Sequence, residues 1–229
     1  MDSSSLQLSI IVPMFNETGQ APSLARHLQM FQANGCEIII VDGDSTDDTA
    51  WIMQKNGFLV LQSKRGRATQ MNAGAQQASG DILVFLHADT RLPESADVLI
   101  MKSLESGKHQ WGRFNVHING DQLLFRLIGL LMNWRSCLTG IATGDQAIFV
   151  KRDTFMSMGS FPEQPLMEDI ELSRQLRQIS PPACLQACVL TSGRRWEKRG
   201  VWHTIFLMWR LRWAYWRGVP AEQLAEEYL

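Results

Sequence analysis

The stretch GRATQMNAGAQQASGDILVFLHADT, residues 66–90, decides the fold class. Met71, Ala75 and Ala78 recur at helical spacing within a run of small residues, which predicts a helix. The continuous apolar run at 82–86 is typical of a strand that is buried on both faces. A helix that leads directly into a buried strand is the repeating unit of a parallel sheet.

The same alternation of strand and helix precedes this stretch. Three more strands are predicted, at residues 8–12, 38–41 and 57–61. One helix is predicted from Pro22. Another is predicted from Ser45, because Asp48 three positions on gives the pattern of a capping box. The resulting order predicts an α/β protein with a mostly parallel central sheet flanked by helices.

Residues beyond 90 show a different pattern. We predict helices at 92–104, 123–137 and 169–179, and strands at 114–118 and 147–150. A chain of 229 residues, at roughly 100–200 residues per domain, is one large domain or one domain with an appendage.

Charge and motif composition exclude several classes of function. The chain has 22 basic and 23 acidic residues, so it lacks the overall positive field of a nucleic-acid-binding protein. It contains no GxxxxGK[ST] segment, no GxGxxG after the first strand and no GxSxG. These absences argue against a P-loop enzyme, a dinucleotide cofactor and a hydrolase with a nucleophile elbow.

Polar side chains follow each of the first four predicted strands. They are Glu17 in PMFNE, Asp42 and Asp44 in VDGDSTDDT, a basic cluster at 64–67, and His87 with Asp89 in FLHADT. In an open parallel sheet the carboxyl ends of the strands meet at one edge, where ligands bind. One Asp after a strand is often only a helix cap, but four such segments together predict a site for a nucleotide diphosphate. The carboxylate of Asp89 is a suitable ligand for a divalent cation that bridges two phosphates.

These segments resemble a known family. IIVPMFNE, VDGDSTDDT and residues 66–90 together look like a family 2 glycosyltransferase with the GT-A fold, and GDQAIFVKRDTF and PLMEDIELSRQLR extend the likeness. The likeness runs from about Leu8 to about Trp216. It is strongest to a bacterial subgroup described as radical-SAM/selenodomain-associated transferases.

The resemblance implies roles on the donor side of the site. Pro13 and Glu17 are expected to line the nucleotide pocket. Asp42 is expected to contact the base, with Asp44 beside it, and Arg67 is expected to approach the diphosphate or the sugar. The donor implied is a nucleotide sugar, with a UDP-sugar as the family-level guess.

The resemblance also implies a divalent cation, Mn²⁺ or Mg²⁺, on Asp89. His87 stands where the family has the first Asp of its Asp-x-Asp motif. A neutral imidazole is acceptable to Mn²⁺ but is a poorer ligand for Mg²⁺. His87 therefore has three open roles, which are ligating the metal, hydrogen-bonding the sugar, and packing at the strand end.

Asp169 in MEDIE is implied to be the catalytic base, although it could also be only a charge at a helix N-terminus. Asp145 is expected to touch the acceptor or the donor sugar, or else to be a turn residue. Arg195 and Trp196 resemble the end of a motif that lies near the acceptor and the leaving group in processive relatives. The Gln that usually precedes that motif is missing, which argues against processivity.

The end of the chain has a composition of its own. Residues 194–217 carry seven basic residues and one acidic residue, and five of the eight tryptophans lie at 196–216. A helix is predicted from Trp202, with aromatic residues on one side and His203, Arg210 and Arg217 on another. This pattern at 202–217 fits contact with an anionic membrane surface. Packing on the rest of the chain and formation of a homodimer are the alternatives.

We therefore expect an inverting, metal-dependent transfer of a sugar to an acceptor hydroxyl, which fits a lipid-linked or membrane-bound acceptor. A nucleotidyltransferase acting on a sugar phosphate and a non-catalytic nucleotide-binding scaffold are the alternatives. The expected organisation is a catalytic domain over 1–193, with a nucleotide-binding half at 6–92 and an acceptor half at 93–193, and an amphipathic helical appendage at 194–229. With no targeting segment visible, the expected location is the cytoplasm, extending to peripheral attachment on the inner face of the membrane.

Overall fold

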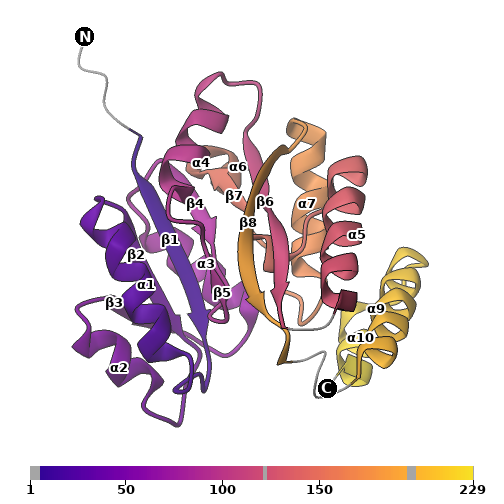
Figure 1. Cartoon of the computed structure of the whole chain (residues 1–229), viewed down its shortest axis with the longest axis horizontal. Helices are drawn as coiled ribbons and strands as arrows, with labels where there is room; N and C mark the ends of the chain where they lie inside the picture. Colours follow the sequence, from indigo (N-terminus) through magenta and orange to yellow (C-terminus); the bar gives the residue numbers. More distant parts are fainter. Residues whose placement is uncertain (1–5, 121–122, 195–199, 229) are drawn as a thin grey trace.

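One sheet runs through the whole structure (Figure 1). The computed structural model describes residues 6–120, 123–194 and 200–228. Within these residues eight strands are arranged in the order β3-β2-β1-β4-β7-β6-β8-β5. The strands are β1 (Leu8–Met14), β2 (Glu37–Asp42), β3 (Leu59–Gln62), β4 (Ile82–Phe85), β5 (Thr90–Arg91), β6 (Trp111–Asn119), β7 (Phe149–Lys151) and β8 (Ala183–Ser192).

Helices cover both faces of this sheet. One layer contains α1 (Ala21–Ala33), α2 (Thr49–Lys55) and α4 (Ala96–Glu105), and the other contains α3 (Arg67–Gln77), α6 (Arg152–Ser157) and α7 (Glu168–Ile179). A third group of helices lies beyond β6, and consists of α5 (Leu123–Thr139), α9 (Val201–Trp216) and α10 (Ala221–Tyr228). The α/β prediction with a mostly parallel, helix-flanked sheet is confirmed.

The first four strands are parallel because a crossover helix connects each of them to the next. β1 pairs with β2 on one side and β4 on the other, and β2 pairs with β3. Successive side chains of β1 point to opposite faces, so Ile10 and Val12 join one core and Ile11 joins the other. Burial on both faces explains the uninterrupted apolar runs in the sequence.

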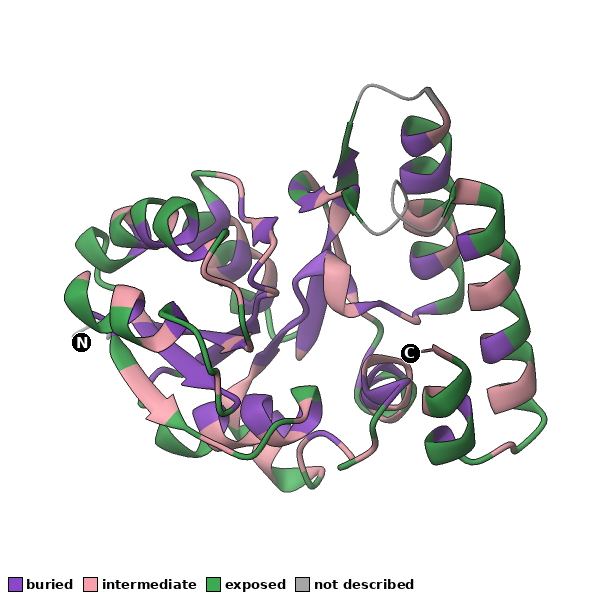
Figure 2. Ribbon diagram, turned by 90° about the horizontal axis from the view of Figure 1, so that it is seen from below, coloured by how far each residue is buried: buried purple, intermediate pink, exposed green. Residues whose placement is uncertain are grey.

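The direction of pairing changes in the middle of the sheet. β4 pairs antiparallel with β7, and β7 pairs antiparallel with β6, while β6 and β8 are parallel. The short β5 pairs with β8 through Thr90 and Thr191. The turn that follows β4 is thereby tied to the far edge of the sheet. Figure 2 views the molecule from the side on which β1 and β2 end, with buried strands in the middle and α9 at the margin.

Several predicted element boundaries are wrong for identifiable reasons. α2 begins at Thr49 rather than Ser45, because Ser45 and Thr46 form hydrogen bonds with Asn16 of the neighbouring loop. α4 begins at Ala96 rather than Leu92, because the Leu92 amide donates to His27. Ala147 was predicted in a strand but has a φ of 46°, and β7 begins only at Phe149.

The sequence pattern gave no prediction for β8. Its burial alternates irregularly, and a register shift opposite Phe114 and Asn115 of β6 breaks the two-residue period. β6 is buried on both faces over its first four residues and alternates only after Asn115, so the predicted half-exposed strand describes its second half.

The helix predicted at the end of the chain is present as α9. Leu211 packs with Leu166, Met167 and Leu224 of α10. Five large aromatic side chains face away from this contact, with exposed fractions between 59% and 79%, namely Trp202, Phe206, Trp209, Trp213 and Trp216. Packing on the rest of the chain therefore does not account for these five. Across the described part of the chain, no helix combines the length and the apolar character needed to span a bilayer.

Candidate active site

The loops after β1 and β2 are joined by hydrogen bonds at the edge where both strands end. The amide of Thr46 donates to the Asn16 side chain at 2.9 Å, and the amide of Glu17 donates to the hydroxyl of Thr49 at 2.8 Å. Asp47 accepts from the amides of Thr18 and Thr49. Glu17 is therefore held at a fixed position above the end of the sheet.

Asp42 is the last residue of β2, and its carboxylate is almost fully buried. One oxygen accepts the Ser45 amide at 3.1 Å, while the other, Oδ1, is buried without a hydrogen-bond partner. Asp44, two residues on, is exposed with a φ of 60°. A buried carboxylate oxygen without a partner is costly in a folded protein, which suggests that a donor from a ligand completes it.

Gln70 of α3 fixes the walls around Asp42. Its side-chain NH₂ donates to the carbonyls of Met14 and Val41, at 2.9 and 2.8 Å. A Cβ on Gly43 would lie 2.9 Å from the same amide group, so only glycine allows this close approach. The ends of β1 and β2 and the start of α3 are thus locked together by one buried side chain.

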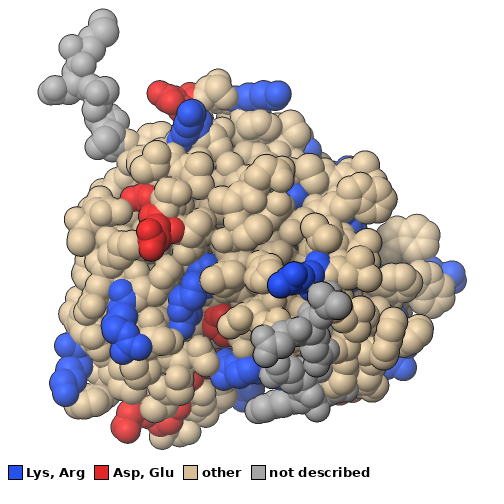
Figure 3. Space-filling view, in the orientation of Figure 1, with Lys and Arg blue, Asp and Glu red and all other residues tan. Residues whose placement is uncertain are grey.

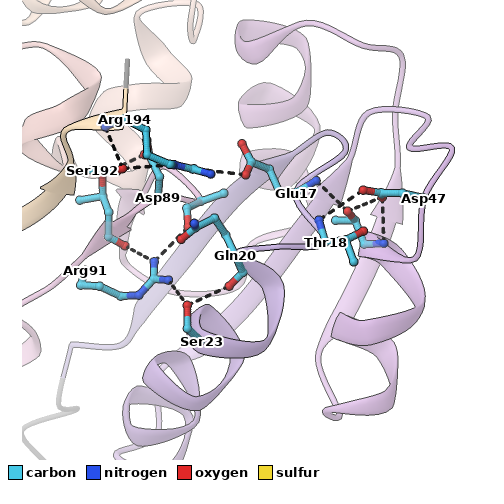
Figure 4. Close-up of polar contacts among 12 residues, drawn as sticks. Glu17, Thr18, Gln20, Ser23, Asp47, Asp89, Arg91, Ser192 and Arg194 are labelled. Carbon is cyan, nitrogen blue, oxygen red and sulfur yellow. Dashed lines mark hydrogen bonds and ion pairs between the residues drawn. The ribbon is translucent and has the colours of Figure 1, made fainter. Parts of the chain in front are cut away.

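Glu17 and Asp89 lie close together on the donor side (Figure 4). Arg194, just after β8, places its guanidinium 3.6 Å from the Glu17 carboxylate. Burial raises the pKa of Glu17, the charge of Arg194 opposes the rise, and the nearby charge of Asp89 adds to it. Arg91 ties the Asp89 turn to α1 by donating to the carbonyl of Ala88 and to Ser23.

His87 lies on the other side of the same turn. Its Nδ1 is 3.3 Å from Oδ1 of Asp145, and a Cβ on Gly144 would come within 2.3 Å of its Nε2. One ring nitrogen thus faces Asp145 and the other is packed against Gly144. Of the three roles left open for His87, this contact fits packing and positioning at the strand end best.

Asp169 is the second residue of α7, and its carboxylate contacts the same segment. Its Oδ2 accepts the backbone N–H of Gly144 at 2.8 Å. Met167, immediately before the helix, has a φ of 66°, an uncommon conformation for a residue with a side chain. This turn brings the first two residues of α7 into the site, where the helix N-terminus favours negative charge.

Arg67 and Glu168 form an ion pair across the site, with 3.3 Å between Nη1 and Oε1. The Glu168 side chain is 3% exposed and that of Arg67 is 42% exposed. Burial raises the pKa of Glu168 and the charge of Asp169 raises it further, while Arg67 opposes both. Desolvation lowers the pKa of Arg67, but the charges of Glu168, Asp145 and Asp169 outweigh it and leave the pKa raised.

The structure therefore gathers the predicted residues into two adjoining groups. The donor-side group contains Glu17, Asp42 and Asp89, near the half-buried Pro13. The transfer-side group contains Arg67, His87, Asp145 and Asp169. The two groups meet at the turn of residues 87–89. Arg195 and Trp196 lie outside the described residues.

Charged side chains of both signs appear at this end of the molecule in the space-filling view (Figure 3). Among the described residues, no three His, Cys, Asp or Glu side chains cluster as a ready-made metal site. One carboxylate such as Asp89 still fits the usual way in which Mg²⁺ or Mn²⁺ is held beside a substrate diphosphate, which supplies further oxygens itself.

Comparison with known families decides the classification. The model of the family described as "Glycosyl transferase family 2" matches residues 9–157. This chain belongs to glycosyl transferase family 2. The matched range includes Glu17, Asp42, Arg67 and Asp89 of the site, and ends before Asp169.

Two curated relatives of this family 2 chain illustrate its similarities. It is 31% identical to a GalNAc(5)-diNAcBac-PP-undecaprenol beta-1,3-glucosyltransferase of Campylobacter jejuni, over 50% of this chain and 40% of the relative. It is 28% identical to an undecaprenyl-phosphate 4-deoxy-4-formamido-L-arabinose transferase of Pseudomonas syringae, over 67% of this chain and 44% of the relative. The chain thus spans less than half the length of these two relatives.

A solved structure agrees with the fold. The mannosyltransferase PcManGT of Pyrobaculum calidifontis, in complex with GDP-Man and Mn²⁺, superposes with a TM-score of 0.64 at 19% identity. The match covers 93% of this family 2 chain and 62% of PcManGT. The GT-A fold expected from the sequence is confirmed.

The structure adds residues that the sequence analysis did not select. Glu168, next to the selected Asp169, is the more buried of the two acids. Gln70 could have been selected from the sequence, because a polar residue beside Met71 interrupts the apolar face of α3. Arg194 could not have been selected in this way, because its position beside Glu17 depends on the β5–β8 pairing, which the sequence did not predict.

Proposed function

We propose that this protein transfers a sugar, with inversion, from a nucleotide diphosphate to an acceptor hydroxyl, and that a divalent cation takes part. The observation that carries the proposal is the meeting of Asp169, Arg67 and the turn of residues 87–89 at the carboxyl edge of the sheet. Family membership supports glycosyl transfer. The site residues support the reaction type.

The donor side provides a binding site for the nucleotide. The buried Oδ1 of Asp42 can accept an N–H of the base, which would give this oxygen the partner it lacks. Pro13, Glu17 and Asp44 lie around the same strand ends and would line the pocket. A uridine nucleotide stays the expected donor from the family resemblance.

Asp89 is the residue that would hold the cation, Mn²⁺ or Mg²⁺. When bound, the cation neutralises negative charge that develops on the departing nucleoside diphosphate. Arg67 lies where its guanidinium can approach the diphosphate or the sugar. Arg194, now paired with Glu17, is within the same group and can exchange that carboxylate for a phosphate oxygen.

Asp169 serves as the base in this mechanism. The acceptor hydroxyl attacks the anomeric carbon from the face opposite the diphosphate. A bond forms from the acceptor oxygen to that carbon while the bond to the diphosphate oxygen breaks. The hydroxyl proton passes to the Asp169 carboxylate, whose orientation is fixed by the amide of Gly144. Attack from the opposite face inverts the anomeric centre with no covalent intermediate.

A lipid-linked or membrane-bound acceptor fits the exposed aromatic face of α9. The name of one relative contains undecaprenol and that of the other contains undecaprenyl-phosphate, and the five exposed aromatic side chains of α9 suit the membrane interface. We also propose peripheral attachment to the inner face of the membrane through residues 202–217. The motif likeness further supports placement in the radical-SAM/selenodomain-associated subgroup.

The decisive experiment is a thermal-shift and donor-hydrolysis screen of nucleoside diphosphates and nucleotide sugars, with and without Mn²⁺. Nucleotide binding at 100 times its Kd stabilises a protein by about 2.7 kcal/mol, which a thermal shift detects. Asp89→Asn should remove the Mn²⁺ dependence, whereas Glu94→Gln at an exposed acid should keep it. If no nucleotide binds and no nucleotide sugar is hydrolysed, the proposed function is wrong.

A further inference from the structure

Two arginines face each other where α5 meets α9. The helices lie side by side (Figures 1 and 2), and Ile128 and Met132 of α5 share an apolar cluster with Ile205 of α9. Arg135 lies three residues after Met132, and Arg212 lies seven residues after Ile205. Helical periodicity therefore places both arginines on the facing sides of the two helices.

Three nitrogens of these two guanidinium groups are buried without a hydrogen-bond partner. Nε and Nη2 of Arg135 and Nε of Arg212 are buried without a hydrogen bond, and across the described ranges neither group forms an ion pair. Burial lowers the pKa of Arg135 to about 10, and the charge of Arg212 contributes to this. Two like charges with unsatisfied buried donors destabilise a fold, so the arrangement calls for an anion.

The pair lies beside the base rather than beside the nucleotide. The charge of Asp169 acts on both arginines, and that of Asp145 acts on Arg212. Asp169 makes no ion pair with either arginine among the described residues. The donor side already contains Arg67 and Arg194 for phosphate. Arg135 and Arg212 come from helices on the far side of the transfer-side group.

We propose that Arg135 and Arg212 bind a phosphate group carried by the acceptor, close to the hydroxyl that Asp169 deprotonates. This inference rests on the proposed function and defines its acceptor class. Guanidinium groups bind phosphate through paired N–H donors, and the buried nitrogens of this pair are such donors.

The surroundings of the pair indicate a phosphate on an apolar molecule. Trp134 and Trp213 each neighbour one of the two arginines in sequence and are largely exposed. Exposed leucines on α5 continue this surface at Leu127, Leu130, Leu131 and Leu138. An isoprenoid chain that is linked through phosphate to the group bearing the acceptor hydroxyl presents the matching combination of a charged head and an apolar chain.

The test compares farnesyl phosphate, farnesol and inorganic phosphate, below micelle-forming concentrations, by tryptophan fluorescence of the full chain. Trp134 and Trp213 provide the signal. The wild type should bind farnesyl phosphate at least about tenfold more tightly than farnesol, a difference of about 1.4 kcal/mol. Arg135→Gln with Arg212→Gln should abolish this preference and leave farnesol binding unchanged. Arg126→Gln with Arg210→Gln, which removes two exposed arginines from the same helices, should keep the preference.

Several outcomes would overturn the assignment. The first is a preference for farnesyl phosphate over farnesol that survives in the Arg135/Arg212 double variant. The second is a wild type that binds farnesyl phosphate and farnesol equally tightly. The third is inorganic phosphate binding as tightly as farnesyl phosphate, which would indicate a site for free phosphate. Weakened nucleoside diphosphate binding in the double variant would assign the pair to the donor instead. The melting temperature of the double variant should not fall, because like charges are removed, so loss of binding through misfolding is detectable. Failure of the donor screen would overturn the proposed function without affecting the comparison of the two farnesyl probes.

Discussion

The carboxylate of Asp169 accepts a hydrogen bond from the backbone N–H of Gly144, with 2.8 Å between Oδ2 and N. Because the donor is a main-chain group, it orients the carboxylate without competing for a proton. The same glycine packs against His87, so one residue connects Asp169, the proposed base, to the turn that carries Asp89. This relationship leads to the first two predictions.

Asp169→Asn should reduce sugar transfer by about 10²–10⁴-fold, the usual contribution of a general base. The Asn side-chain oxygen can still accept the Gly144 amide, so the geometry and nucleotide binding should be unchanged. Steady-state transfer rates and thermal shifts with nucleotide measure the two effects separately. Glu171→Gln, in the same helical turn, is the control and should keep near-normal turnover. Turnover of Asp169→Asn within a few-fold of wild type would show that another group is the base.

Gly144→Ala should lower both activity and melting temperature. The new Cβ would lie 2.3 Å from Nε2 of His87, so the ring must move away from Asp145. Adding His87→Ala removes the clash and should restore the melting temperature. The single variant His87→Ala should keep its Mn²⁺ response, since the ring faces Asp145 and Gly144. Loss of that response in His87→Ala would instead support a metal-ligand role.

Arg67→Ala should make stability more sensitive to pH. Glu168 has a raised pKa, so the folded state binds its proton more readily than the unfolded chain does. Its contribution to stability is therefore full at low pH and is lost as pH rises from 4.5 through the folded pKa. Removing Arg67 takes away the charge that opposes this rise and leaves a buried carboxylate unpaired. The melting temperature of Arg67→Ala should fall more steeply than that of wild type as pH rises above 4.5.

The double variant Arg67→Ala with Glu168→Gln is the control for this prediction. Without an ionisable group at 168, the additional slope should disappear. Equal slopes for Arg67→Ala and wild type would show that the pair is too well solvated to affect folding.

Trp209→Ala with Trp213→Ala should weaken binding to vesicles containing anionic lipid at low salt by at least about tenfold. Burying one large apolar side chain is worth roughly 1.5–3 kcal/mol, so the loss of two is easily detected by flotation. Trp51→Ala, at an exposed tryptophan on α2, is the matched control. A wild type that does not float would show that the aromatic face does not bind the membrane. If the double variant instead dissociates a dimer in sedimentation, the aromatic face is a contact between two copies of this chain.

The sequence predicted the parallel half of the fold well because its strands are buried on both faces. The runs at 8–12 and 38–41 are continuously apolar, which is typical of such strands. The residues that follow them meet at one edge of the sheet because parallel strands end on the same side. The acceptor half was harder to predict. The burial pattern of β8 has no regular period. The turn at Met167 that directs Glu168 inward depends on a left-handed backbone conformation, which the residue types there do not predict.

The site was predictable where it depends on strand ends and unpredictable where it depends on contacts between distant helices. Asp42 and Asp89 could be selected because each follows a predicted strand, whereas Asp169 was selected through the family resemblance. The facing of Arg135 and Arg212 follows from how α5 and α9 pack, and each arginine in isolation resembles an ordinary surface cation.

Gln70 has a consequence for how the proposed nucleotide pocket would evolve or be engineered. Its single amide joins the main chain at Met14 and Val41 before any nucleotide arrives. The ordering entropy of these loops is therefore part of folding and is not subtracted from affinity. A pocket made rigid in this way selects a nucleobase whose shape already matches it, because the pocket does not change shape on binding. Broadening the range of nucleotides accepted would require weakening the hydrogen bonds of Gln70 as well as changing the residues that contact the nucleobase.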